Sequence, residues 1–352
     1  MAHLLFLAAA ACAARPVTSA GPAPERIALA ISERGEAGTR LVAIDEHGDR
    51  RLVLVRAADT LARDTNPAIS PDGRWIVFAS SRGRTLDQTS LWIAQLAPDA
   101  VAVQLTTGTA IDSHPVWQRD GSAIVFASTR AGSFDLYALA IDRAGHAVGE
   151  PRALTSAPGH EVTPTIAPDG TIVYGAITPA PDGQVESHLE ARAPDGTITK
   201  LTAGPADTSP ALSPDGKLLA FARPIEHHGA PDAELWVVPM RGDTAHQLVD
   251  LPLTDESGPV WSRDGRFVFA TSVLRGARGN VMFSSVIVVD TRAAHPSARI
   301  LQDRTGAIAR LTPAIATAEL DAKALDADPE YLPELARITA AAIAAQPPEA
   351  TP

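Results

Sequence analysis

The stretch that decides the fold is PVWQRDGSAIVFASTRAGSFDLYAL, residues 115–139. It begins with a proline and a short apolar run, passes through Arg-Asp-Gly at 119–121, and continues into two further apolar segments. Asp and Gly favour a tight turn, because the Asp side chain bonds the backbone just ahead of it and Gly accepts a positive φ. The stretch therefore predicts a β-hairpin followed by a third strand.

The start of this stretch occurs five times along the chain. Successive copies begin 48, 49, 46 and 49 residues apart. The copies read PAISPDGR from Pro67, PVWQRDGS from Pro115, PTIAPDGT from Pro164, PALSPDGK from Pro210 and PVWSRDGR from Pro259. A fixed period of this length is typical of solenoids, propellers and arrays.

Each repeat contains four short segments with the character of strands. In the second copy these are residues 115–117, 123–128, 135–141 and 152–155. The second segment of every copy is apolar and rich in β-branched or aromatic residues, as expected of buried strands. Four strands within roughly 45 to 50 residues predict one blade of a β-propeller.

The two ends of the repeat array complement each other. Residues 26–31, 40–44 and 51–55 resemble strands two to four of a blade that lacks its first strand, and residues 311–315 resemble a first strand with nothing after it. Joined, they would form a composite blade without an open edge. We therefore expect an all-β, six-bladed propeller over residues 21–317, closed by this composite blade.

The last segment, residues 318–352, is rich in Ala, Leu, Glu and Asp. This composition favours helix over strand. It predicts a short C-terminal helical tail docked on the side of the propeller, with a partner-binding or flexible tail as the alternatives.

The N-terminus has the character of an export signal. Residues 4–14 form an unbroken apolar run, too short to span a bilayer but of the length found in secretory signals. Residues 1–20 are therefore predicted to be a signal, cleaved after Ala20 or lipidated at Cys12. Cys12 is the only cysteine, so a disulfide within the chain is excluded.

The charge balance argues against a nucleic-acid partner. The chain has 41 acidic and 30 basic residues and a formal net charge of -11, with no cluster of Lys and Arg. Binding to phosphate backbones depends on such clusters.

An acidic residue lies three positions before each repeat proline. These residues are Asp64, Asp112, Glu161, Asp207 and Glu256. In a propeller the segment leading into the innermost strand lies beside the central channel, so the five carboxylates could form a ring that attracts a basic peptide or a cation, calcium being the most natural metal. Alternatively, they are structural and bond backbone amides or an arginine of the same blade, with Arg82, Arg130 and, more loosely, Arg223 and Arg275 as partners. Five similar copies argue against a catalytic role.

The residues immediately before the repeat prolines differ from blade to blade. They are Asn66, His114, Thr163, Ser209 and Gly258. Residues that hold the fold recur in every blade, whereas residues that bind a specific ligand differ between blades, so these positions are candidates for specificity. His114 is the one titratable member, and it serves either as a hydrogen-bonded structural residue or as a ligand or switch.

PAISPDGRWIVFASSRG, residues 67–83, and the stretch at 115–139 resemble the WD40-like Pro-Asp repeat of the TolB propeller and its relatives. The resemblance extends over residues 26–315 and implies a six-bladed propeller in the bacterial envelope. TolB carries an additional α/β domain before its propeller, whereas only about 20 residues precede the first predicted strand here, so we do not expect the TolB role from the resemblance alone. Some relatives carry a serine peptidase domain after the propeller, but no Gly-x-Ser-x-Gly motif is present.

These features together predict a non-enzymatic monomer that binds an envelope protein or a peptide. It would be periplasmic or a lipoprotein anchored to the outer membrane, with secretion as a further alternative, and would have no transmembrane span and no required cofactor. Two other functions stay open. One is a hydrolase or lyase in the channel that uses the acidic residues, His114 and a cation, and the other is a propeller that binds a carbohydrate or small molecule.

Overall fold

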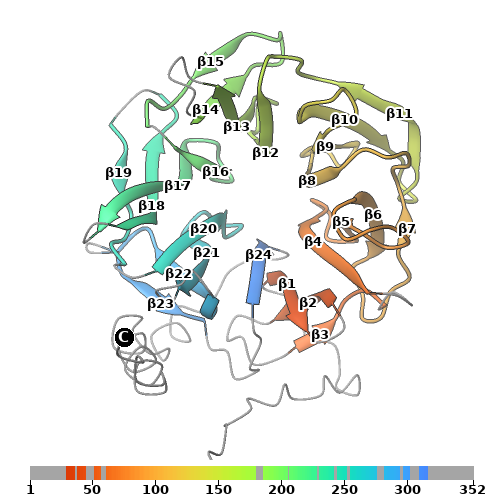
Figure 1. Cartoon of the computed structure of the whole chain (residues 1–352), viewed down its shortest axis with the longest axis horizontal. Coiled ribbons are helices and arrows are strands. Elements are labelled where there is room, and N and C mark those ends of the chain that lie inside the picture. The colour runs from red at the N-terminus through yellow and green to blue at the C-terminus, as the bar shows by residue number, and fades with distance from the viewer. Residues whose placement is uncertain are drawn as a thin grey trace, which may run out of the picture.

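The chain forms a ring of β-sheets around a central channel (Figure 1). The computed structural model describes residues 29–35, 38–44, 51–56, 61–179, 185–204, 206–227, 230–241, 244–251, 254–275, 281–293, 296–301 and 309–315. Within these ranges there are 24 strands in five sheets and no helix. The all-β class that the repeats predict is therefore observed.

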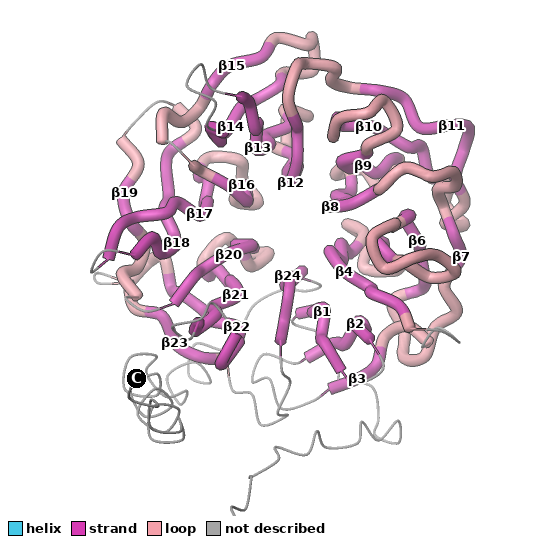
Figure 2. Tube along the Cα trace, viewed as in Figure 1, coloured by secondary structure: helices cyan, strands magenta, loops and turns pink. Residues whose placement is uncertain are grey.

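Four of the sheets contain one repeat each. Their strands are β8 (Asp112–Trp117), β9 (Ala123–Ser128), β10 (Asp135–Ile141) and β11 (Ala147–Ala153); β12 (His160–Ile166), β13 (Ile172–Pro179), β14 (Val185–Arg192) and β15 (Ile198–Lys200); β16 (Thr208–Leu212), β17 (Leu218–His227), β18 (Ala230–Pro239) and β19 (His246–Gln247); and β20 (Thr254–Trp261), β21 (Phe267–Arg275), β22 (Val281–Asp290) and β23 (Ala298–Ile300). Consecutive strands pair antiparallel, and the first strand of each sheet lies nearest the channel (Figure 2).

The fifth sheet has eight strands. They are β24 (Ala309–Ile315), β1 (Leu29–Gly35), β2 (Gly38–Ile44) and β3 (Arg51–Val53), followed by β4 (Ala62–Ile69), β5 (Trp75–Ser80), β6 (Ser90–Gln95) and β7 (Val103–Gln104). β24 pairs antiparallel with β1, so the last described strand and the first lie side by side.

The expectation of six blades is wrong, because the described strands form five sheets. β2 and β4 pair in parallel, with Gly38 opposite Ala62 and Thr39 opposite Arg63, and this pairing joins the N-terminal strands and the first full repeat into one sheet. Gly38 permits the contact, since its φ is +121° and a Cβ there would lie 2.4 Å from the Ala62 carbonyl oxygen. The sequence pattern counts repeats and carries no signal for this pairing.

No helix is present among the described residues, so the helical part of the expected fold is also not supported. The segment predicted to form it, residues 318–352, lies outside the described residues, as do the predicted signal at residues 1–20 and Cys12 within it.

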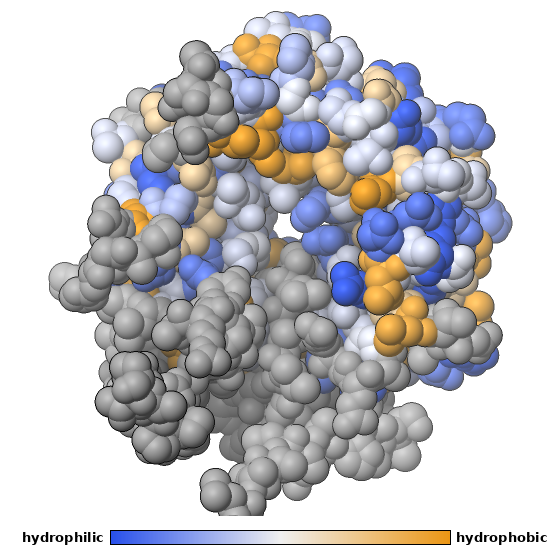
Figure 3. All heavy atoms as spheres, viewed as in Figure 1, coloured by the Kyte–Doolittle hydropathy of each residue, from blue (hydrophilic) through white to orange (hydrophobic). Residues whose placement is uncertain are grey.

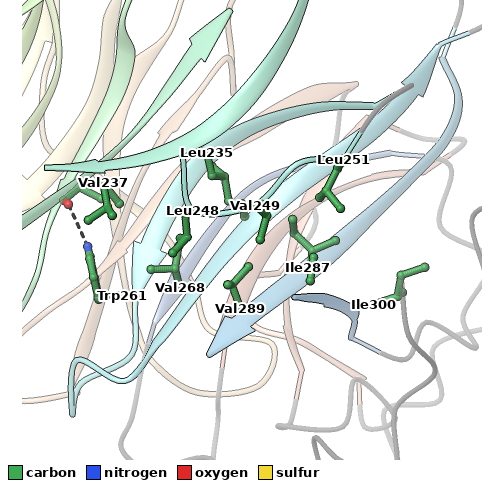
Figure 4. Close-up of a cluster of buried hydrophobic side chains, with 14 of the residues drawn as sticks. Leu235, Val237, Leu248, Val249, Leu251, Trp261, Val268, Ile287, Val289 and Ile300 are labelled. Atoms are coloured by element: carbon green, nitrogen blue, oxygen red, sulfur yellow. Dashed lines mark hydrogen bonds between the residues drawn. The ribbon is translucent and has the colours of Figure 1, made fainter. Parts of the chain in front are cut away.

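Apolar side chains fill the space between neighbouring sheets. Figure 4 shows the cluster in which Leu235 and Val237 of β18 pack against Val268 of β21 and Ile287 of β22. Burying each such side chain contributes about 1.5 to 3 kcal/mol. At the inner edge of the cluster the indole N–H of Trp261 donates to the Ala211 carbonyl at 2.9 Å, which ties the innermost strand of one sheet to that of the preceding sheet.

Candidate binding channel

The residues before the repeat prolines share an unusual backbone conformation. Asn66, His114, Thr163, Ser209 and Gly258 have φ values of 49°, 49°, 51°, 53° and 61°. This left-handed region is uncommon for a residue with a Cβ, and for a β-branched threonine it is an outlier. In all five sheets the pairing of the innermost strand shifts register at this point. The following proline lacks an N–H and cannot donate to the neighbouring strand, which is consistent with the interruption of the ladder at this point.

These five residues line one cavity at the centre of the ring, with a volume of about 480 Å³. Figure 3 shows the central opening among the side chains. The five repeat prolines also line it, together with Ala68, Ile69, Val116, Thr165, Ala211, Leu212, Pro214, Ser257, Val260 and Trp261. No Asp, Glu, Lys or Arg is among these lining residues. A cavity of this size with a few polar groups on apolar walls is typical of a ligand site.

His114 lines this cavity as a neutral group. Its side chain is half-buried, and its Nδ1 lies 3.1 Å from the Ser113 hydroxyl oxygen. Desolvation lowers the pKa of His114 to about 4. At neutral pH the ring therefore carries no charge, and one of its two nitrogens already contacts Ser113.

The three aspartates of the predicted acidic ring are buried inside the sheets and do not line the cavity. Asp64, Asp112 and Asp207 are 3%, 1% and 0% exposed. Their carboxylates accept hydrogen bonds from arginines of the same repeat, at 2.6 Å from Arg82, 2.9 Å from Arg130 and 2.6 Å from Arg223. The three guanidinium groups also lie over aromatic rings, which favours the cation. These contacts are the structural alternative that the sequence raised, and binding of a partner by these aspartates stays a prediction.

The two glutamates of the predicted ring have different surroundings. Glu161 and Glu256 are buried, and among the described residues neither forms an ion pair with an arginine. Burial raises the pKa of Glu161 to about 7, and the nearby charge of Asp135 adds to the effect. The side chain of Arg275, an expected partner for Glu256, is not among those described.

Glu256 meets a second buried carboxyl group from the preceding sheet. The Ser272 hydroxyl donates to Glu256 Oε1 at 2.8 Å, and the Leu251 amide donates to Glu234 Oε1 at 2.9 Å. Burial raises the pKa of both glutamates, and the charge of Glu234 adds to the rise at Glu256. Two such carboxyl groups share a proton at neutral pH more readily than they both ionise.

Neither a metal site nor a membrane-spanning helix is found in the part of the chain that the structure describes. No three His, Cys, Asp or Glu residues there are arranged to hold a metal ion. No helix in that part is long and apolar enough to cross a membrane.

The sheets and the channel define a β-propeller. The chain belongs to the TolB β-propeller family, because the model of the TolB β-propeller domain matches residues 84–264, just over half of the chain. No curated protein matches the chain in sequence.

Solved structures with a similar fold include two TolB proteins. The putative TolB from Agrobacterium tumefaciens is 20% identical with a TM-score of 0.59, and the match covers 83% of this chain and 92% of that one. TolB from Acinetobacter baumannii is 17% identical with a TM-score of 0.64, over 82% of this chain and 66% of that one. Hydrazine synthase from Kuenenia stuttgartiensis is 13% identical with a TM-score of 0.62, over 82% of this chain and 46% of that one. At these identities the likeness shows the fold alone.

Several residues of the cavity are not identified by the sequence analysis. Ile69, Ser257 and Pro214 line it, although none of them belongs to the acidic or pre-proline positions. Ile69 and Ser257 lie on innermost strands, but consecutive residues line the cavity there because the bulge interrupts the alternation of side chains, so the period of a regular strand does not indicate them. Pro214 belongs to a turn that only the closed ring brings to the cavity.

Proposed function

We propose that this propeller is an exported, non-enzymatic scaffold that binds a peptide segment, offered by another envelope protein, in its central cavity. The observation that carries the proposal is the ring of pre-proline residues. The five positions share one backbone conformation and differ in side chain, and they converge on one cavity. A constant frame with variable side chains is the arrangement expected of a recognition site on a scaffold.

The lining of the cavity supports binding over catalysis. Acid–base catalysis needs unlike titratable groups placed around one reacting position. The cavity has His114 as its one titratable lining residue, and the glutamates with raised pKa lie within the sheets, outside the lining.

Export to the envelope is supported by two features of the sequence. The apolar run at residues 4–14 has the length of a secretory signal, and the chain belongs to the TolB β-propeller family. Lipidation at Cys12 and simple cleavage are both compatible with this location.

The proposal is tested with glycine substitutions that remove side chains while suiting the left-handed backbone. The variant combines Asn66→Gly and His114→Gly, which makes both positions like Gly258. The matched control is Asp99→Gly, because Asp99 has a φ of 53° and does not line the cavity. Tagged wild type and variants are purified from native cells after mild crosslinking, and the N-terminus and companions are identified by mass spectrometry.

We expect one stoichiometric envelope protein with the wild type and with Asp99→Gly, reduced at least about 10-fold in the double variant, in line with the loss of one or two net hydrogen bonds. Equal recovery from the double variant would overturn the cavity as the binding site. A wild type that carries no companion but is stabilised by sugars would favour the small-molecule alternative, for which the cavity volume is also suitable.

A further inference from the structure

The cavity has two layers of side chains that differ in polarity. The first layer consists of the pre-proline residues, and the second consists of residues three positions later, roughly 10 Å further toward the Asp-Gly turns at about 3.3 Å per strand residue. Of the five described residues at this second position, three line the cavity, namely Ile69 of β4, Leu212 of β16 and Trp261 of β20. Pro214, from the turn after β16, adds to them. The part of the cavity nearest these turns is therefore lined by apolar side chains.

Two of the sheets allow a direct comparison, because both have Pro-Val-Trp on the innermost strand. Trp117 of β8 and Trp261 of β20 are 6% and 5% exposed, and each indole N–H donates to a carbonyl of the preceding sheet, at 3.1 and 2.9 Å. Of the two, Trp261 alone lines the cavity. The residue before the proline is His114 in the first sheet and Gly258 in the second. The side chain that Gly258 lacks therefore explains why the cavity reaches the tryptophan of β20 and not that of β8.

The polar groups nearest to the second layer are already bonded within the protein. The indole N–H of Trp261 donates to the Ala211 carbonyl, and the Pro214 carbonyl accepts from Arg119. The other two side chains of this layer have no polar atom. A hydroxyl or N–H group of a ligand placed among these side chains would lose its bonds to water without gaining a partner from them, which costs free energy. The second layer therefore favours a ligand group without polar atoms.

We propose that Ile69, Leu212 and Trp261 form a subsite for one large side chain without polar atoms, such as leucine or phenylalanine, of the bound peptide. Gly258 admits this side chain, which makes it a residue that decides specificity. This inference rests on the proposed function and specifies its ligand. The subsite lies on one side of the ring, since β16 and β20 belong to successive sheets and β24 lies between β20 and β4 (Figure 1). Transfer of the ligand side chain from water to these apolar walls favours binding.

The test uses three sets of uncharged hexapeptides, N-acetylated and C-amidated, that share mixed glycine, serine and asparagine positions and differ at one central residue. That residue is leucine, alanine or tyrosine. Equilibrium dialysis against the purified full chain, followed by mass spectrometry, measures the bound fraction of each set. The main variant is Gly258→His, which gives β20 the His-Pro-Val-Trp sequence of β8. The matched control is Gly121→His, because Gly121 has a φ of 72°, an added Cβ there meets nothing within 4 Å, and it does not line the cavity.

We expect the wild type and Gly121→His to bind the leucine set at least about 10-fold more tightly than the alanine set, since each of the three further carbon groups of leucine contributes about fourfold when buried. The tyrosine set should bind less tightly than the leucine set, because its hydroxyl finds no partner. Gly258→His should bind the leucine and alanine sets within about 3-fold of each other. If Gly258→His does not fold, Ile69→Ser should lower the preference for leucine at least about 3-fold, because it places a hydroxyl in the second layer.

Equal binding of the leucine and alanine sets by the wild type would overturn the subsite while leaving peptide binding in the cavity intact. Equal binding of the tyrosine and leucine sets would overturn its apolar character. An unchanged preference in Gly258→His would overturn the role of Gly258. Binding of no set by the wild type would overturn both the subsite and the proposed function.

Discussion

Equivalent positions in the five sheets bury a carboxyl group in two different ways. At β4, β8 and β16 the acid is an aspartate paired with an arginine of the same sheet. At β12 and β20 it is a glutamate, and the pKa of each is raised by burial and by a nearby carboxyl group. In the register of the strands, Thr178 and Leu274 occupy the places that Arg82 and Arg130 occupy in the aspartate sheets.

All five repeats therefore have a buried acidic residue at this position, but they stabilise it in two different ways. In the aspartate sheets an arginine bonds the buried carboxylate, whereas in the glutamate sheets burial and a nearby carboxyl group raise the pKa and favour the protonated form. The first arrangement depends on one arginine, and the second depends on pH. Four experiments test whether the two kinds of sheet differ in this way.

The largest expected effect is the loss of an arginine from an aspartate sheet. Arg223→Ala would leave Asp207, which is 0% exposed, as an unpaired buried charge. Removing one partner of a buried pair costs about 3 to 5 kcal/mol. The free energy of unfolding in urea measures it. Arg74→Ala is the control, because its pair with Asp72 is exposed and the change should cost about 1 kcal/mol or less. Similar losses of unfolding free energy in Arg223→Ala and Arg74→Ala would show that the buried ion pair is no more important than an exposed one.

The next effect is a pH dependence that arises between β18 and β20. Because the folded-state pKa of Glu234 and Glu256 is raised, their contribution to stability is fully present below the ordinary glutamate pKa and is lost as the pH rises through the raised values. Glu256→Gln copies the protonated form. The Tm of the wild type should therefore fall more steeply than that of Glu256→Gln between pH 5 and 9, with the difference in unfolding free energy growing by up to about 1.4 kcal/mol per pH unit. If Tm falls equally with pH in the wild type and in Glu256→Gln, the two glutamates share no proton. Asp207→Asn is the contrasting variant, and it should lower the Tm by a similar amount across this pH range.

A smaller effect of the same sign is expected at Glu161. Its folded-state pKa of about 7 means that stability is lost as the pH rises from the ordinary glutamate range through 7. Glu161→Gln should thus match the wild type near pH 5 and exceed its unfolding free energy at pH 8 by about 1 to 3 kcal/mol. Urea unfolding at the two pH values measures this difference. If Glu161→Gln lowers the unfolding free energy equally at pH 5 and pH 8, Glu161 stabilises the fold through its hydrogen bonds and not through its protonation.

The smallest effect concerns the backbone that both kinds of sheet share. Thr163→Gly should relieve the left-handed conformation at its φ of 51° and raise the unfolding free energy by up to about 1 kcal/mol, net of the entropy that glycine loses on folding. Gly258→Thr should lower it by a similar amount. Thermal unfolding of both variants is the measurement. A loss of stability in Thr163→Gly and a gain in Gly258→Thr would show that contacts of the side chain outweigh the cost of the left-handed backbone.

Local chemistry made much of the fold predictable from the sequence. The repeat prolines and the Asp-Gly turns predicted the hairpins and the order of strands, and the fixed spacing indicated Arg82 and Arg130 as partners of Asp64 and Asp112. The number of sheets was predicted wrongly, because the pairing of β2 with β4 depends on a close contact at Gly38.

Contacts between different repeats could not be predicted from the sequence, because they form only when the ring of sheets closes. Glu234 comes from a neighbouring repeat, and Arg119 bonds a carbonyl 95 residues away. The pre-proline positions line one cavity, but their left-handed backbone and the neutral lining depend on how five strands bulge toward one axis, which the sequence pattern does not show.

The central claim is that the ring of pre-proline residues contacts a ligand. A photo-crosslinking amino acid placed at His114 tests it most directly, with the same amino acid at Asp99 as the control of equal backbone conformation. The account predicts that, in native cells, position 114 crosslinks to one envelope protein, at a segment of uncharged residues, and that position 99 does not. No crosslink at 114, or the same products at both positions, would contradict it.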